Sequence, residues 1–127
     1  MRTQRSIRLA LAGAALLVAG CSALSPGETQ PLAIHLQGGY EADDVEVWVD
    51  DDVVFRSRIT TNNVLGLAQE VEIERKEGRH IVTVRVNGET TGTRSILLRA
   101  PLFVGISYNE AEDRILFVVS EEGFVYF

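Results

Sequence analysis

From residue 32 onward the apolar residues of this chain recur at every second position, and this alternation restricts the fold more than any other feature. The clearest runs are residues 32–36, 45–49 and 82–86, where valine, isoleucine or leucine occupies alternate positions. Successive side chains of a strand point to opposite faces, so these runs predict strands with one face in a core. Glycine, asparagine and aspartate clusters separate the runs, as expected of turns. No stretch has apolar residues at the spacing of a helix. Residues 61–68 predict at most one helical turn.

Complementary faces set the register of a first predicted hairpin around three aspartates. With Asp50, Asp51 and Asp52 as a three-residue loop, apolar residues lie opposite apolar ones and acidic residues opposite basic ones. A two-residue loop would place valines opposite arginines, so the hydrophobic pattern favours the longer loop. The predicted pairs are Val49–Val53, Val47–Phe55 and Val45–Ser57 on one face, and Trp48–Val54, Glu46–Arg56 and Asp44–Arg58 on the other.

Turn residues predict the remaining connections. These are a hairpin at 76–79 that pairs Ile73 with Val82 and Val71 with Val84, a hairpin at Asn87-Gly88 that leads into 93–99, a link at 109–113 between strands 102–108 and 114–120, and a bend at 121–123 before a last strand at 124–127. Residues 115–119 are apolar at both phases, so we expect them to lie centrally or to be covered. The sequence therefore predicts an all-β domain over residues 32–127, a single antiparallel β-sandwich of about 7–9 short strands.

The N-terminus has the features of an export signal. Three arginines among the first eight residues give a positive start, and residues 9–20 form an unbroken run of apolar and small residues. A membrane-spanning helix needs about 20 apolar residues, so this run is too short to span a bilayer permanently. The run ends in Val18-Ala19-Gly20-Cys21, which places small side chains directly before the only cysteine of the chain.

This ending resembles the lipobox of bacterial lipoproteins. The resemblance implies that residues 1–20 are a signal peptide, that cleavage falls between Gly20 and Cys21, and that the Cys21 thiol carries a lipid with acyl chains such as palmitate. Two or three acyl chains give stable membrane anchoring. Ser22, where an aspartate would favour the inner membrane, favours the outer membrane of a bacterium with two membranes. Residues 21–31 are rich in polar and turn-forming residues and predict a flexible tether.

The net charge of the chain excludes some classes of partner. Removing the signal removes three of the 12 basic residues and none of the 18 acidic ones, which leaves a net charge of −9. An acidic surface repels phosphate backbones, so no nucleic-acid partner is expected. The same charge disfavours adhesion to anionic lipid headgroups, so contact with the membrane would depend on the lipid anchor.

The predicted domain resembles small immunoglobulin-like or transthyretin-like β-sandwiches. The stretch Glu77-Gly78-Arg79-His80-Ile81-Val82-Thr83-Val84 is similar to the G-x-H-x-V-x-V hairpin of many bacterial accessory β-domains. This similarity supports the fold class and identifies no specific family.

Trp48 is the first candidate for a binding surface. It falls on the polar phase of its strand, together with Glu46 and opposite Arg56. An exposed aromatic ring among polar groups predicts a platform for a sugar ring, a peptide or a partner protein. The alternative is a ring that is covered by the Arg56 stem or a loop, or that faces the core.

Asp50, Asp51 and Asp52 are the candidate metal ligands, with calcium as the metal that carboxylates would suit. The glycine and distal glutamate of an EF-hand loop are missing. Consecutive strand residues also point to opposite sides, so a hairpin turn with solvated charges is the favoured interpretation. Apart from the lipid at Cys21, no cofactor is expected.

The histidines and serines predict no catalytic site. His80 lies in phase with Val82 and is predicted to be a partly buried structural residue, whereas His35 lies on a polar phase and is predicted to face solvent. Two histidines are too few for a zinc triad, no serine lies in a G-x-S-x-G elbow, and no glycine-rich phosphate loop occurs. The protein is therefore not expected to be an enzyme, and no small-molecule substrate can be identified.

Together these features predict a membrane-anchored lipoprotein of the bacterial cell envelope. Its sandwich would be a non-catalytic binding or accessory module, and its partner another protein of an envelope assembly. The alternative is a calcium-assisted carbohydrate- or peptidoglycan-binding module that uses Trp48 and the three aspartates.

Overall fold

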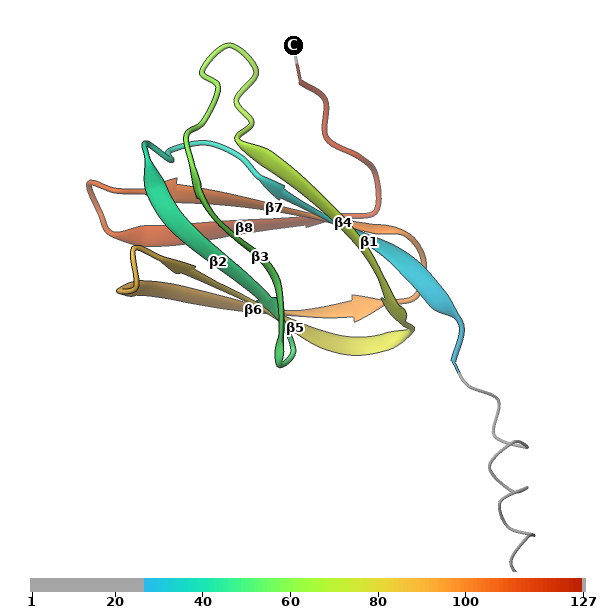
Figure 1. Ribbon diagram of the computed structural model, residues 1–127. Helices are drawn as coiled ribbons and strands as arrows, with labels where there is room; N and C mark the ends of the chain where they lie inside the picture. The colour runs from blue at the N-terminus through green and yellow to red at the C-terminus, as the bar shows by residue number, and fades with distance from the viewer. Residues whose placement is uncertain (1–26, 127) are drawn as a thin grey trace, which may run out of the picture.

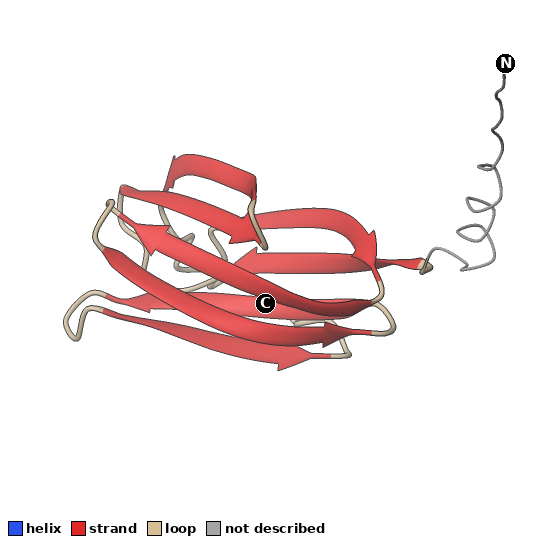
Figure 2. Ribbon diagram, turned by 90° about the horizontal axis from the view of Figure 1, so that it is seen from below, coloured by secondary structure: helices blue, strands red, loops and turns tan. Residues whose placement is uncertain are grey.

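The structure is a computed structural model that describes residues 27–126, and its regular secondary structure there is entirely β (Figures 1 and 2). The predicted all-β class is confirmed, and the eight strands agree with the predicted number of about 7–9. No helix long and apolar enough to cross a membrane occurs within 27–126. The strands are β1 (Thr29–Leu36), β2 (Asp43–Val49), β3 (Asp52–Ile59), β4 (Gln69–Lys76), β5 (Gly78–Val86), β6 (Thr90–Leu98), β7 (Leu102–Asn109) and β8 (Arg114–Ser120).

Two four-stranded sheets form the sandwich, with strand orders β4-β1-β7-β8 and β3-β2-β5-β6. Every neighbouring pair is antiparallel except β1 and β7, which run parallel with Leu32 opposite Leu102. The predicted antiparallel sandwich is therefore confirmed, except that one of its strand pairs is parallel. β1 begins at Thr29, before the predicted domain start at residue 32, and Thr29 pairs with Lys76 of β4.

The core lies between the sheets and contains the three alternating runs identified in the sequence. The valines and leucines of those runs have almost no solvent exposure, and they come from β1, β2 and β5. Full burial of one such side chain stabilises the fold by about 1.5–3 kcal/mol. The fully buried members are Leu32, Ile34, Leu36, Val45, Val47, Val49, Val82, Val84 and Val86.

The first predicted hairpin is correct at its open end and wrong at its turn. Val47 pairs with Phe55 as predicted, but a β-bulge follows, so that Trp48 pairs with Val53 and not with Val54. Asp52 belongs to β3 and pairs with Val49, which leaves a two-residue loop. The bulge takes up the extra residue, so the shorter loop does not reverse the faces farther down the hairpin.

The second predicted hairpin is wrong, because its two strands lie in different sheets. Ile73 of β4 pairs with Leu32 of β1, whereas Val82 of β5 pairs with Val49 of β2. The chain passes from one sheet to the other at Gly78, whose φ of 133° is a conformation that other residues rarely adopt. Ile73 and Val82 both belong to apolar faces, and periodicity alone cannot distinguish strands that pair from strands that face each other.

The two later hairpins are confirmed. Asn87 and Gly88 have positive φ angles of 54° and 71°, and the Glu89 N–H donates to the Val86 carbonyl at 3.1 Å. Two central residues with positive φ define the turn that Asn-Gly favours between antiparallel strands. β5 and β6 flank this turn, and β7 and β8 flank the predicted link at 109–113.

β8 does not have the central or covered position predicted from its apolar residues. It is the outermost strand of its sheet, and the side chains of Leu116 and Val118 are 40% and 54% exposed. Ile115, Phe117 and Val119 point the other way and pack against the core.

The C-terminal segment covers the middle of the outer face of the β4-β1-β7-β8 sheet, at β1 and β7. Residues 124–126 are not a strand, which corrects that part of the predicted last strand. Tyr126 stacks on His35 with ring centroids 5.7 Å apart, and Phe124 packs edge-on against His35 and Phe103. His35 is therefore buried, with 7% exposure, and its predicted contact with solvent is wrong. The segment runs beside the sheet in Figure 1.

Candidate functional site

The candidate site is the outer face of the β3-β2-β5-β6 sheet, which we call the Trp48 face. Its centre comprises Trp48 and Glu46 of β2, Arg56 of β3, and Thr83 and Arg85 of β5. Their places follow from the strand period, because β2 buries Val45, Val47 and Val49 and turns the intervening residues outward. Val53 and Ile81 on this face are 42% and 49% exposed, whereas the C-terminal segment packs against His35 on the outer face of the other sheet.

Charged side chains on the Trp48 face are held by ion pairs. The Arg56 Nε lies 3.0 Å from Glu46 Oε2, and the Arg85 Nη1 lies 4.0 Å from the other oxygen of that carboxylate. One carboxylate thus contacts two guanidinium groups, one on each neighbouring strand. Farther along the sheet, hydrogen bonding to the Arg58 guanidinium lowers the pKa of Asp44. The predicted pairing of Glu46 with Arg56 is confirmed by the strand register.

Trp48 is half-buried and borders a shallow hollow. The hollow has a volume of about 200 Å³ and is lined by Trp48, Asp50, Thr83 and Arg85. The Trp48 ring points away from the core, which excludes the core-facing alternative. Cover of the ring by the Arg56 stem stays a prediction. A large ring with polar groups on one side can offer apolar area and hydrogen bonds to the same ligand.

Apolar side chains extend the Trp48 face beyond the residues predicted from sequence. Val53, which pairs with Trp48, is 42% exposed, and Ile81 of β5 is 49% exposed. Leu97, on the β6 edge, is 38% exposed. Arg85 and Thr83 were missed as neighbours of Trp48 because the sequence pattern assigned β5 to pair with β4. The non-local pairing of β2 with β5 brings them together.

The three candidate metal ligands have separate surroundings. Asp50 accepts hydrogen bonds from the His80 ring and the Ile81 N–H, and Asp52 lies 3.6 Å from an Arg75 guanidinium nitrogen. Asp51 is exposed in the turn. Within 27–126, no three histidine, cysteine, aspartate or glutamate side chains form a group that could hold a metal ion. Calcium binding stays a prediction.

His80 joins the β2–β3 turn to the start of β5. Its Nδ1 lies 2.7 Å from Asp50 Oδ2 and its Nε2 lies 2.7 Å from the Lys76 carbonyl oxygen. Burial disfavours charge on the ring, but these two bonds outweigh burial and raise the pKa of His80. Burial acts on Asp50 in the opposite direction to the bonds from His80 and Ile81, and the net effect lowers the pKa of that carboxyl. His80 is partly buried, as the sequence predicted.

Neither histidine forms a hydrogen bond with a serine in the part of the chain that the structure describes. His35 Nδ1 lies 2.7 Å from the Tyr126 hydroxyl, and His80 bonds to Asp50 and a carbonyl. The chemistry that the Trp48 face offers is recognition by an aromatic ring, aliphatic side chains and oriented charges. Gly20 and Cys21, the predicted cleavage and lipidation residues, lie outside the described residues, as does the predicted signal peptide.

Comparison with known proteins identifies no relative. No protein-family model, no curated protein and no solved structure matches the chain.

Proposed function

We propose that this protein is a lipid-anchored lipoprotein of the bacterial envelope, and that its β-sandwich is a non-catalytic binding module for another envelope protein. The observation that carries the binding role is the open Trp48 face, where a half-buried tryptophan lies among exposed aliphatic side chains and paired charges. The proposed anchor rests on the sequence Val18-Ala19-Gly20-Cys21 after a short apolar run.

The composition of the Trp48 face favours a protein partner over a small ligand. Tryptophan and arginine are enriched among residues that dominate the energy of protein interfaces. Val53 and Ile81 add apolar area on both sides of Trp48, while Glu46 and Arg56 supply charges for complementary pairing. The hollow beside Trp48 has a volume of about 200 Å³, whereas small-molecule sites are usually clefts of about 300–1,000 Å³.

The proposed anchor would keep this surface close to the membrane. Cys21 precedes Thr29, the first residue of β1, by eight residues. A chain of that length spans at most about 28 Å when fully extended. An outer-membrane position follows from Ser22 only if the bacterium has two membranes. A partner would then be another component of the same envelope layer.

The anchor is tested by Cys21→Ser. In bacterial cells, we expect the unmodified chain to sediment with membranes and the variant to lose lipid and leave the membrane fraction. Metabolic labelling with a palmitate analogue reports the lipid directly. If the chain with Cys21 took up no label, the proposed lipidation would be contradicted. A Cys21→Ser variant that stays membrane-bound at full length would indicate that an uncleaved signal acts as the anchor.

The binding role is tested by crosslinking the full, lipidated chain in cells, with Trp48→Ala as the variant. We expect one stoichiometric protein with the unmodified chain and its loss with the variant. Arg114→Gln, which alters an exposed arginine at the start of β8, is the control and should retain the partner. Recovery of glycan fragments without a protein would instead support the carbohydrate- or peptidoglycan-binding alternative, and a calcium titration would then decide whether the aspartates contribute.

A further inference from the structure

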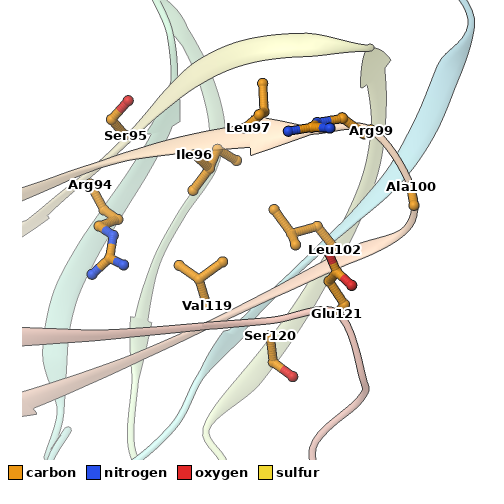
Figure 3. A pocket seen from close by; sticks show the side chains of 10 residues that line it. All are labelled: Arg94, Ser95, Ile96, Leu97, Arg99, Ala100, Leu102, Val119, Ser120 and Glu121. Carbon is orange, nitrogen blue, oxygen red and sulfur yellow. The ribbon is translucent and has the colours of Figure 1, made fainter.

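A second surface lies at the facing edges of the two sheets, where a groove opens between β6 and β8 (Figure 3). The groove has a volume of about 620 Å³, compared with about 200 Å³ for the hollow beside Trp48. β6 contributes Arg94 and Leu97, the connection to β7 contributes Arg99, and β8 contributes Val119 and Ser120. These residues lie apart from the centre of the Trp48 face.

β6 packs closely against β8 at one end of the two strands, away from the residues that line the groove. A Cβ placed on Gly92 of β6 would lie 2.9 Å from the Ile115 Cβ and 3.1 Å from a Phe117 ring carbon. The absent side chain of Gly92 therefore lets the two edges approach at this point. Farther along both strands, Arg94 and Val119 line the groove.

The groove carries arginines without ion-pair partners in a protein that is acidic overall. The chain has 18 acidic and 12 basic residues, yet no ion pair within 27–126 involves Arg94 or Arg99. Figure 3 shows Arg94 extending from β6 toward the side where Val119 lies, and Arg99 at the loop end. Glu121 lines the same groove without pairing with either arginine. The charges of this groove are complementary to acidic side chains.

Both strands that border the groove are outermost strands of their sheets. An outermost strand has a row of backbone N–H and C=O groups that can pair with an added strand. Natural proteins usually block such edges with charges or proline, but β8 has no charged residue between Arg114 and Ser120. Leu116 and Val118 of β8 are also exposed on its outward side.

We infer that the groove receives an extended, acidic segment of a partner protein, which adds to the edge of β8 as a further strand. Alternate side chains of the added strand would point to opposite faces. One set, acidic, would lie beside Val119 and face Arg94, while the other set, apolar, would lie beside Leu116 and Val118. The inference does not depend on the Trp48 face, because it rests on the edge of β8 and on Arg94 and Arg99, none of which belongs to the centre of that face.

The test uses a peptide of about six residues, the length of a typical strand, in which valine alternates with glutamate and both ends are blocked. The isotopically labelled full chain, held in detergent, is titrated with this peptide and followed by amide NMR shifts. We expect shifts confined to β6, β8 and the loop at Arg99, together with slowed exchange of β8 amides. The same peptide with lysine in place of glutamate should bind at least about fivefold more weakly, as expected from exposed charge pairs.

Arg94→Gln combined with Arg99→Gln should weaken binding of the glutamate peptide by about fivefold. Arg58→Gln, which alters an exposed arginine of β3 away from the groove, should leave it unchanged. Equal binding of both peptides, unchanged binding by the double variant, or shifts located only around Trp48 would overturn the inference. A concentration-dependent dimer that disappears in the double variant would also overturn it, since a second copy of the chain would then be the occupant. Folding of the variants is checked by their unperturbed core amide shifts.

Discussion

The outer faces of the two sheets differ in what covers them. On the β4-β1-β7-β8 sheet, the chain's own C-terminal segment packs Phe124 and Tyr126 against His35. On the β3-β2-β5-β6 sheet, Trp48 stays half-buried and Ile81 is 49% exposed. Both faces carry an aromatic or imidazole ring on the polar phase of a strand. Strand phase therefore places a side chain inside or outside the sandwich, but tertiary packing decides whether an outside residue contacts water.

The connection between β1 and β2, which joins the two sheets, should give the largest loss of stability when altered. Gly39 lies between β1 and β2 with a φ of 94°, and a Cβ there would overlap the Tyr108 carbonyl. Gly39→Ala should therefore lower the free energy of unfolding by about 3 kcal/mol, through backbone strain and steric overlap. Urea denaturation of the full chain in detergent measures this loss.

Gly66→Ala is the matched control for that change. Gly66 also has a positive φ, 75°, but a Cβ there would meet no atom within 4 Å. It should cost only about 1 kcal/mol, from backbone conformation alone. Equal losses at the two glycines would contradict the close contact between the β1–β2 connection and β7.

The cover on the β4-β1-β7-β8 sheet should give the next largest effect. Tyr126 stacks on His35, and its hydroxyl lies 2.7 Å from His35 Nδ1 and 3.0 Å from Gln37 Nε2. Tyr126→Ala removes the stacking and both hydrogen bonds, so the free energy of unfolding should fall by about 2 kcal/mol. Val125→Ala, next to it and 73% exposed, should change stability by less than about 0.5 kcal/mol. If both variants were equally stable, the segment would not cover the sheet in solution.

The same contrast explains which parts of the fold could be predicted. The alternation in β1, β2 and β5 identified the core strands, because valine and leucine burial is a local pattern. The Asn87-Gly88 turn was equally readable, because positive φ at two residues is a local requirement. The pairing of β4 with β1 and of β5 with β2 joins distant segments. Nothing local distinguishes it from the hairpin predicted at residues 76–79.

The candidate site was predictable in part for the same reason. Trp48, Glu46 and Arg56 share one hairpin, so their proximity follows from local register. Arg85 reaches Glu46 only through the non-local β2–β5 pairing. The exposed position of β8 depends on which strand ends the sheet, and its apolar residues predicted the opposite.

The two histidines extend the comparison to pH, since each belongs to a different sheet. Both ring nitrogens of His80 face acceptors at 2.7 Å, Asp50 and the Lys76 carbonyl, and only the protonated ring can donate to both. Because folding raises the pKa of His80 above its ordinary 6.5, the stability it contributes is complete below pH 6.5 and is lost as pH rises through the raised pKa. Asp50, whose pKa is lowered from 3.8, contributes stability above pH 3.8 that is lost at lower pH, as the carboxyl becomes protonated.

The contribution of the His80–Asp50 pair to stability should therefore be greatest between pH 3.8 and 6.5. The urea midpoint should fall from there toward pH 8. His80→Gln should remove most of that fall, while His35→Gln should leave it in place. Imidazole NMR signals identify which histidine titrates. A fall that persists in His80→Gln would assign the pH dependence to another group and break the link between the β2–β3 turn and β5.

The smallest effect on stability is expected on the open face. Arg56 and Glu46 form an ion pair at 3.0 Å, but the arginine side chain is 61% exposed. Exposed pairs contribute little because water screens them, so Arg56→Ala should lower the free energy of unfolding by about 0.5 kcal/mol or less. A double-mutant cycle with Glu46→Gln measures the pair itself. If this face binds a partner, the same substitution should weaken binding by more than it weakens folding, since partner contact removes water from the pair. Parallel loss of folding and binding would instead mean that these charges serve the sheet alone, as Tyr126 serves the covered face.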